Sequence, residues 1–231
     1  MILFASWRPS LVICMTLLVA APTGKSWPMA QDVFVYRERT GDQQQIEYRW
    51  SLEQRNELFI ISSIQPEKQF QTVCTADGAT LSWSLQKSNG ESMTAHREGN
   101  TMHLFGKMDG KTTDKDITID DRPWFQPLSF SLRSMVTGTK TEQDFWIVRP
   151  DNFSLVVLKA EKNECRTAEI NNKEEDICEV EIKKKGWLAS FWHASYWFRK
   201  SDGLFVEYRS VHGLPGTSET VIQLIQDSKK K

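Results

Sequence analysis

Apolar and polar residues alternate with a period of two in several parts of this chain of 231 residues. In residues 46–52, 81–85 and 178–182, every second residue is apolar and those between are polar. Successive side chains of a β-strand point to opposite faces of the sheet, so each segment is expected to bury one face and expose the other. The pattern therefore predicts a mainly β fold with antiparallel strands.

Turn signals divide the chain into short segments. The dipeptides Asp77-Gly78, Asn89-Gly90 and Asp109-Gly110 favour the positive φ angles of tight hairpin turns. Less regular strands are predicted at residues 33–39, 58–64, 70–75, 102–108, 117–119, 145–148, 153–158, 204–211 and 220–225. A strand about every 8 to 14 residues is typical of a meandering sheet, sandwich or barrel. Because no repeat or linker divides them, we expect residues 27–231 to form a single antiparallel β domain.

One stretch, residues 123–136, departs from the period of two. Its apolar residues recur at helical spacing, at Trp124, Leu128, Leu132 and Met135 or Val136. Asp120 and Asp121 precede the stretch in cap-like positions, and Gly138 follows near its end. We expect one short helix here that packs its apolar stripe on the sheet or closes one end of a barrel.

The first 26 residues have the pattern of a signal peptide. Arg8 supplies the positive region, and residues 11–21 form an apolar run that is too short to span a bilayer as a mature helix. Small residues before Trp27 predict cleavage there, although Ala30 is another candidate and an uncleaved N-terminal anchor is the alternative. The chain is therefore expected to be periplasmic, and no later apolar segment is long enough for a transmembrane span.

Export decides how the cysteines are interpreted. Ile13 precedes Cys14 where a lipoprotein signal needs a small residue, so lipidation is not expected. Cys165 and Cys178 flank a predicted turn, and in an oxidising compartment they are candidates for a disulfide across a hairpin. Cys74 is then a buried free thiol, or else the partner of one of the other two, because sequence alone does not fix the pairing.

Charge and motifs exclude several kinds of chemistry. The chain has 29 basic and 30 acidic residues, without the basic excess of nucleic-acid-binding proteins. It has no nucleophile elbow, phosphate-binding glycine loop or paired-histidine zinc motif. The acidic residues 109–121 lack the ligand order of a calcium loop, which favours a solvated hairpin. We expect no catalytic residues, no metal and no cofactor.

Nine tryptophans are many for this length, and residues 187–198 hold the densest aromatic patch. One interpretation is a central strand with both faces covered. The other is the aromatic wall of a cavity that can bury an acyl chain or stack on a sugar. The candidate ligand-binding residues are Trp50, Trp83, Phe191, Trp192 and Trp197.

Three groups of residues in the second half resemble a known family. They are Trp124 with residues 128–133, the aromatic residues 186–198, and residues 202–208 with the Gly-Leu-Pro-Gly of 213–216. The chain resembles exported bacterial proteins of domain of unknown function 3108, which are similar in fold to the LolA and LolB lipoprotein carriers. The resemblance implies a strongly curved antiparallel sheet or half-barrel around helices, with a hydrophobic cavity for acyl chains. This sequence departs from the carriers in having one mid-chain helix and no early amphipathic helix.

Together, these patterns predict a periplasmic, non-catalytic protein that binds or chaperones a hydrophobic ligand, a lipid or a lipoprotein acyl chain, on the concave face of its sheet. One alternative is a structural or assembly factor that binds another envelope protein. The other is a hydrolase of envelope polymers, with paired carboxylates brought together from distant strands.

Overall fold

A computed structural model describes residues 31–184, 193–211 and 218–228. Within these residues, fourteen antiparallel strands form one sheet in the order β8-β7-β6-β5-β4-β3-β2-β1-β14-β13-β12-β11-β10-β9. Neighbours in the sheet are neighbours in the chain except where β1 pairs with β14. The predicted mainly β fold with a strongly curved antiparallel sheet is confirmed.

The strands run through most of the described chain. Their bounds are β1 Gln31–Thr40, β2 Ile46–Arg55, β3 Leu58–Ile64, β4 Lys68–Thr75, β5 Thr80–Lys87, β6 Ser92–Glu98, β7 Thr101–Met108, β8 Lys111–Thr118, β9 Glu142–Arg149, β10 Ser154–Ile170, β11 Lys173–Lys184, β12 His193–Arg199, β13 Phe205–Val211 and β14 Glu219–Ser228. Two short helices, α1 (Leu128–Ser131) and α2 (Arg133–Thr137), lie between β8 and β9 in the chain.

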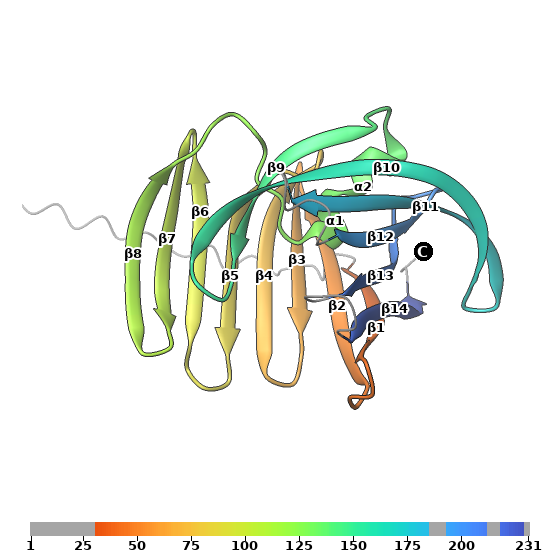
Figure 1. Cartoon of the computed structure of the whole chain (residues 1–231), viewed down its shortest axis with the longest axis horizontal. Coiled ribbons are helices and arrows are strands. Elements are labelled where there is room, and N and C mark those ends of the chain that lie inside the picture. The colour runs from red at the N-terminus through yellow and green to blue at the C-terminus, as the bar shows by residue number, and fades with distance from the viewer. Residues whose placement is uncertain (1–30, 185–192, 212–217, 229–231) are drawn as a thin grey trace, which may run out of the picture.

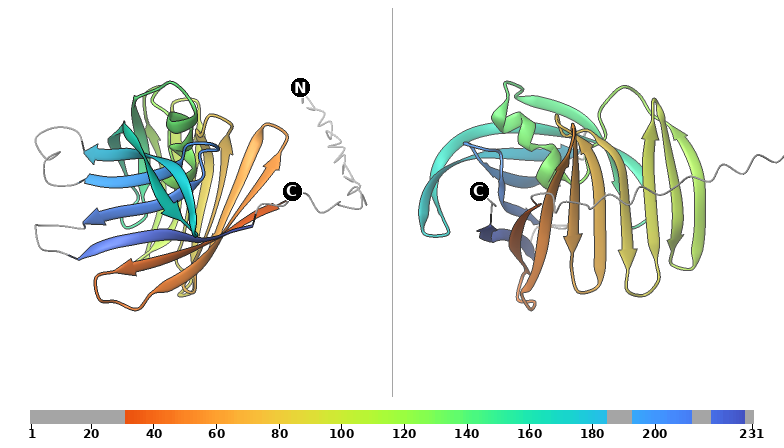
Figure 2. Two further views of the ribbon diagram at one scale, coloured as in Figure 1. Left: turned by 90° about the vertical axis from the view of Figure 1, so that its right-hand side faces the viewer. Right: turned by 180° about the vertical axis from the view of Figure 1, so that it is seen from behind.

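The sheet is rolled so that its two ends face each other. Figure 1 shows β2 to β8 as a curved wall, with the long hairpin of β9 and β10 passing across it. The short helices lie between this wall and the strands β11 to β13, as the two further views in Figure 2 show. The inward faces of the strands and helices therefore share one interior.

The interior holds two clusters of buried side chains. The larger is built from β1 to β4, β9 to β14 and the helices, with Phe34, Phe130, Phe145 and Phe198 among its least exposed members. The smaller joins the concave face of β5 to β7 to the end of the β9–β10 hairpin. Its buried members are Trp83, Leu85, Met93, Ala95, Met102, Leu104, Met108, Ile119, Trp124, Val148 and Phe153. The hairpin thus covers that half of the sheet.

Alternation holds along most strands but fails at the start of β5. The register of β4 and β5 shifts between Val73 and Cys74, so the pairing passes from Ser82 to Thr80 and skips Leu81. Thr80 is consequently buried and Leu81 is 37% exposed. The expectation that Leu81 shares the buried face of Trp83 is wrong. An extra residue in a strand moves the side chains beyond it to the opposite face of the sheet.

The predicted helix begins five residues later than expected. Trp124 lies in an extended segment, where Phe125 N donates to Trp146 O at 2.9 Å and Trp146 N donates to Pro123 O at 2.8 Å. Helical hydrogen bonds start only at Pro127, whose carbonyl accepts from Phe130 N and Ser131 N. Strand-like pairing with β9 therefore replaces the first predicted turn, and Asp120 and Asp121 are not helix caps.

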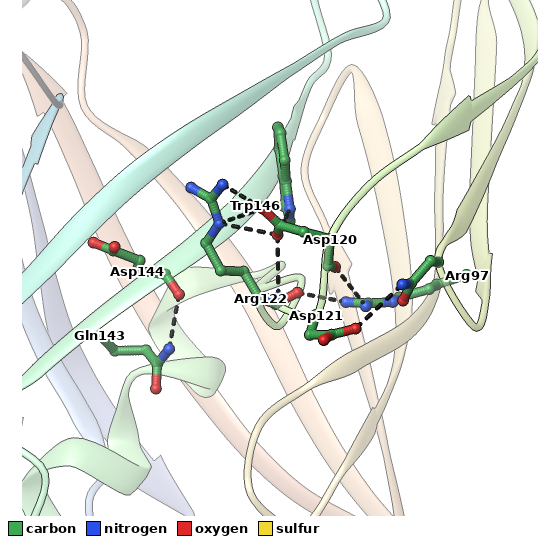
Figure 3. A network of polar contacts seen from close by, with 8 residues as sticks. Arg97, Asp120, Asp121, Arg122, Gln143, Asp144 and Trp146 are labelled. Carbon is green, nitrogen blue, oxygen red and sulfur yellow. Dashed lines mark hydrogen bonds and ion pairs between the residues drawn. The ribbon is translucent and has the colours of Figure 1, made fainter.

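Asp120 and Asp121 instead belong to a polar network that fixes the connector after β8 (Figure 3). Arg97 donates to the carbonyls of Asp120 and Arg122 at 3.0 and 2.6 Å. Asn100 donates to the Asp121 carboxylate at 3.2 Å, and Arg122 pairs with Asp120. The network ties the connector to β6 and to the turn between β6 and β7.

The hairpin of β10 and β11 carries a disulfide. Cys165 and Cys178 lie directly opposite each other in the register and are bonded. Asn171 and Asn172, with φ angles of 51° and 61°, form the turn. Cys74 is a buried free thiol, and burial raises its pKa to about 12.

Candidate ligand-binding cavity

Trp50 and Trp83 line the same cavity, which has a volume of about 220 Å³. Both indoles point inward from the sheet, from β2 and β5, and are 6% and 2% exposed. The volume equals that of about seven water molecules at about 30 Å³ each. Two of the five residues selected from the sequence therefore meet around one space, although 33 residues separate them in the chain.

The other three candidates are placed differently. Trp197 lies opposite Glu179 and Glu207 in the register, and the Arg209 guanidinium carbon is 6.0 Å from its ring centre. It is not among the described residues that line the cavity. Trp197 is half-buried and packs against the larger cluster, but it does not share the cavity wall with Trp50. Phe191 and Trp192 lie outside the described residues.

Six of the fourteen described residues in the cavity wall are aromatic. Its lining comprises Tyr36, Tyr48, Trp50, Ile61, Ser63, Gln65, Phe70, Thr72, Trp83, Gln126, Pro127, Ser129, Pro150 and Phe205. Phe70 stacks on Trp83 with ring centres 6.1 Å apart, and Tyr36 meets Trp50 edge-on at 6.2 Å. Rings that pack against one another keep their positions, so the wall is largely preformed.

The lining is uncharged at neutral pH. The Tyr36 hydroxyl donates to Phe205 O at 2.9 Å, and its burial raises the pKa of Tyr36 well above 10.0. Burial also raises the pKa of Tyr48, which stacks on Tyr36. No carboxylate, histidine or thiol occurs among the described lining residues. The cavity is therefore suited to apolar groups and neutral hydrogen-bonding groups.

Gln126 presents a fixed polar group at the wall. Its side-chain oxygen accepts hydrogen bonds from Trp124 Nε1 at 3.2 Å and Val148 N at 3.1 Å. Its backbone is held by Thr80, whose hydroxyl accepts from Gln126 N at 2.8 Å and donates to Gln126 O at 2.9 Å. These two hydrogen bonds to the oxygen fix the orientation of the amide, and its NH₂ group supplies the donors for a ligand.

A second cavity, of about 400 Å³, adjoins the first. The two share Trp50, Ser129 and Phe205 in their walls. The second cavity differs in carrying charged side chains, namely Asp32, Arg133 and Asp202. An apolar space and a charged space thus lie side by side in the interior.

Sequence reasoning missed Gln126 and Arg133. Both fall in the stretch assigned to one amphipathic helix, where a polar residue is ordinarily solvated. Their roles depend on contacts with β5, β9 and β3, which no local pattern reveals.

Outside the cavities, His96 and His103 stack with ring centres 4.5 Å apart, beside Glu98 and Asp116. In the part of the chain that the structure describes, no group of three His, Cys, Asp or Glu side chains is arranged to hold a metal ion. Across the same residues, no helix has the length and hydropathy needed to cross a membrane.

The fold and the cavities define a class, a rolled antiparallel sheet with adjoining apolar and charged cavities on its inner side. A solved member of this fold is the β-barrel-like protein of domain of unknown function DUF1849 from Brucella abortus. It is similar with a TM-score of 0.60 at 9% identity, over 88% of this chain and 99% of that one. This likeness shows the fold.

Two further solved structures are more distant. The hypothetical lipoprotein YmcC from Escherichia coli gives a TM-score of 0.40 at 12% identity, over 86% of this chain and 85% of that chain. The LolA superfamily protein NE2245 from Nitrosomonas europaea gives 0.24 at 10% identity, over 89% and 88%. These TM-scores are too low to support a conclusion about function. No protein-family model and no curated protein matches the chain, so the assignment to domain of unknown function 3108 stays a prediction.

Proposed function

We propose that this protein binds a lipid-like hydrophobic ligand, such as a lipid or lipoprotein acyl chain, in the cavity between Trp50 and Trp83, without catalysing a reaction on it. The observation that carries the proposal is the partly open cavity whose lining is rich in aromatic rings and has only uncharged polar groups. Burial of an apolar chain contributes about 25 cal/mol of favourable free energy for each Å² of apolar surface removed from water. Trp50 and Trp83 supply the stacking walls, and Gln126 supplies one oriented donor. Phe191 and Trp192 stay candidates on sequence grounds.

Two features support this proposal over the alternatives. The paired carboxylates of a polymer hydrolase have no counterpart in the described lining of the aromatic cavity. An assembly factor that pairs through a strand edge would meet charges on the edge strand β8, where Lys111, Asp114, Lys115 and Asp116 are exposed. Charges on an edge oppose pairing with another strand.

The periplasmic location remains part of the proposal. It rests on the predicted signal peptide, residues 1–26, which lies outside the described residues. The Cys165–Cys178 disulfide supports it, because disulfides persist in oxidising compartments.

A filling substitution tests the proposal directly. Ser63 on β3 is 8% exposed and lines the cavity, whereas its neighbour Ser62 points to the opposite face of the strand. Ser63→Phe is expected to fill the cavity and abolish uptake of a fluorescent acyl probe, while Ser62→Phe is expected to retain uptake. Far-UV circular dichroism establishes that both variants fold. Absence of probe uptake by the unaltered protein, together with lipid-free native mass spectra, would overturn the proposal.

A further inference from the structure

The Arg133 guanidinium packs on two aromatic rings and makes no hydrogen bond or close ion pair with another described residue, although the Asp202 carboxylate acts on it electrostatically. Its Cζ lies 3.9 Å from the ring centre of Phe130 and 4.5 Å from that of Phe59. The side chain is partly buried, and this burial lowers the pKa of Arg133 from its usual range. Arginine nevertheless stays protonated in proteins. A positive charge therefore lies at the wall of the second cavity, which Arg133 helps to line.

One carboxylate in this wall, that of Asp202, is already engaged. Asp202 accepts from Arg199 Nε at 2.9 Å and Nη2 at 2.8 Å, and from Leu204 N at 3.1 Å. Arg199 also pairs with Asp227 at 2.9 Å and Glu175 at 3.6 Å. The carboxylate of Asp202 is thus paired with Arg199.

The backbone holds Arg133 in place. Gly203 has a φ of +67°, and a Cβ there would lie 3.1 Å from Arg133 Cβ and 3.0 Å from Thr137 Cγ2. The turn between β12 and β13 closes on α2 because this residue has no side chain. Ring stacking on one side and this turn on the other orient the guanidinium, which favours a specific site over a freely moving surface charge.

We infer that the protein prefers a single-chain amphiphile with a monoanionic carboxylate, whose chain enters the aromatic cavity and whose carboxylate pairs with Arg133. This inference rests on the proposed function and specifies its ligand. The shared wall of Trp50, Ser129 and Phe205 places the charged space next to the apolar one. A planar guanidinium matches a carboxylate through two parallel hydrogen bonds.

The surrounding charges select the headgroup. Asp32 and Asp202 line the same cavity and repel added negative charge. A carboxylate brings one negative charge against that of Arg133, whereas a phosphate monoester brings about two near neutral pH. A monocarboxylate is therefore the better electrostatic match, and dodecanoate is expected to bind more tightly than dodecyl phosphate.

The test compares ligands that share a chain and differ in headgroup. Isothermal titration of the full chain with dodecanoate and dodecanol, each below its aggregation concentration, is expected to show about tenfold or tighter binding of dodecanoate. That factor is the size of one charge-assisted hydrogen bond. Arg133→Met is expected to remove the preference and leave dodecanol binding unchanged.

The matched control is Arg209→Met. Arg209 also lies over an aromatic ring, that of Trp197, but outside both cavities. This variant is expected to keep the preference for dodecanoate. If Arg133→Met does not fold, the same two ligands are compared on the unaltered protein and on Arg133→Lys. The lysine retains the charge but not the two parallel hydrogen bonds, so its preference for dodecanoate is expected to be weaker.

The outcomes separate the two proposals. Equal binding of dodecanoate and dodecanol, or a preference that survives in Arg133→Met, overturns the role of Arg133 and leaves the hydrophobic cavity standing. Binding of neither ligand overturns the proposed function, and the headgroup site with it. Tighter binding of dodecyl phosphate than of dodecanoate contradicts the choice of a monocarboxylate.

Discussion

The indole Nε1 of Trp146 donates a hydrogen bond of 2.9 Å to the carboxylate of Asp120, and this contact joins the two ends of the sheet. Trp146 belongs to the edge strand β9, and Asp120 follows the opposite edge strand β8. Arg122 pairs with the same carboxylate and lies over the Trp146 ring at 5.2 Å. The rolled sheet is thus closed by this side-chain contact together with the backbone pairing of Trp146 with Pro123 and Phe125, although β8 and β9 do not pair with each other.

This contact predicts an acid-sensitive closure. The hydrogen bond from Arg122, followed by that from Trp146, holds the pKa of Asp120 well below its usual 3.8. A lowered pKa means that the stabilisation is present above pH 3.8 and is lost as the pH falls further. Asp120→Asn is expected to flatten the decrease in stability below pH 4.

Urea unfolding midpoints between pH 7 and pH 2 measure the effect. Asp121→Asn is the control, because Asp121 accepts from Asn100 and does not contact Trp146. Parallel pH profiles for Asp120→Asn and the unaltered protein would argue against a role for Asp120 in acid stability.

The buried tyrosines predict a loss of stability at high pH. Burial raises the pKa of Tyr36 and of Tyr196 well above 10.0. A raised pKa in the folded state gives stability that is complete below pH 10 and decreases as the pH rises beyond it. Absorbance at 295 nm, which reports tyrosinate, is expected to rise over the same pH range as unfolding. Far-UV circular dichroism monitors the unfolding. Complete titration of a still folded protein would contradict this assignment.

The Cys165–Cys178 disulfide is expected to stabilise the β10–β11 hairpin by constraining the unfolded chain. The two cysteines are 13 residues apart. A loop of this size corresponds to about 3 kcal/mol in the chain-entropy model. The double variant Cys165→Ala, Cys178→Ala is expected to lose about that much free energy of unfolding in guanidinium titrations. Reduction of the unaltered protein is expected to reproduce the loss, and reduction of the double variant to add nothing.

Gly78 and Gly90 form a matched pair of turn positions. Their φ angles are +91° and +87°, so alanine is strained at both. A Cβ at Gly78 would lie 2.5 Å from Ser131 O on α1, whereas one at Gly90 would meet nothing within 4 Å. Gly78→Ala is expected to lower the free energy of unfolding by about 1 to 3 kcal/mol more than Gly90→Ala does, because it also forces α1 away from the turn. Equal unfolding midpoints for the two variants would show that α1 moves away from the added methyl group without a loss of stability.

Alternation predicted the inward positions well where strands are regular. Trp50, Trp83 and Val180 are buried as the period of two requires. Strand β6 was missed, because Met93 and Ala95 are its only buried side chains and the rest of Ser92–Glu98 is polar. Its strand pairing depends on β5 and β7 on either side, and such support is not visible in a short window.

The connector before α1 shows where local patterns stop. Trp124 fits a helical stripe, yet hydrogen bonds with β9 and with Thr80 hold its segment extended. Tertiary pairing overrides helix propensity, which is a weak preference. The functional assignments of Gln126 and Arg133 depend on the same rearrangement, so they could be made only from the three-dimensional structure.

The seam between β1 and β14 pairs residue 33 with residue 228, at opposite ends of the described chain. Every other strand pair joins neighbours in sequence. The sheet therefore becomes continuous only when β1 pairs with β14. Contacts between residues so far apart in the sequence form slowly during folding. Closure of the interior therefore requires nearly the whole described chain, from β1 to β14.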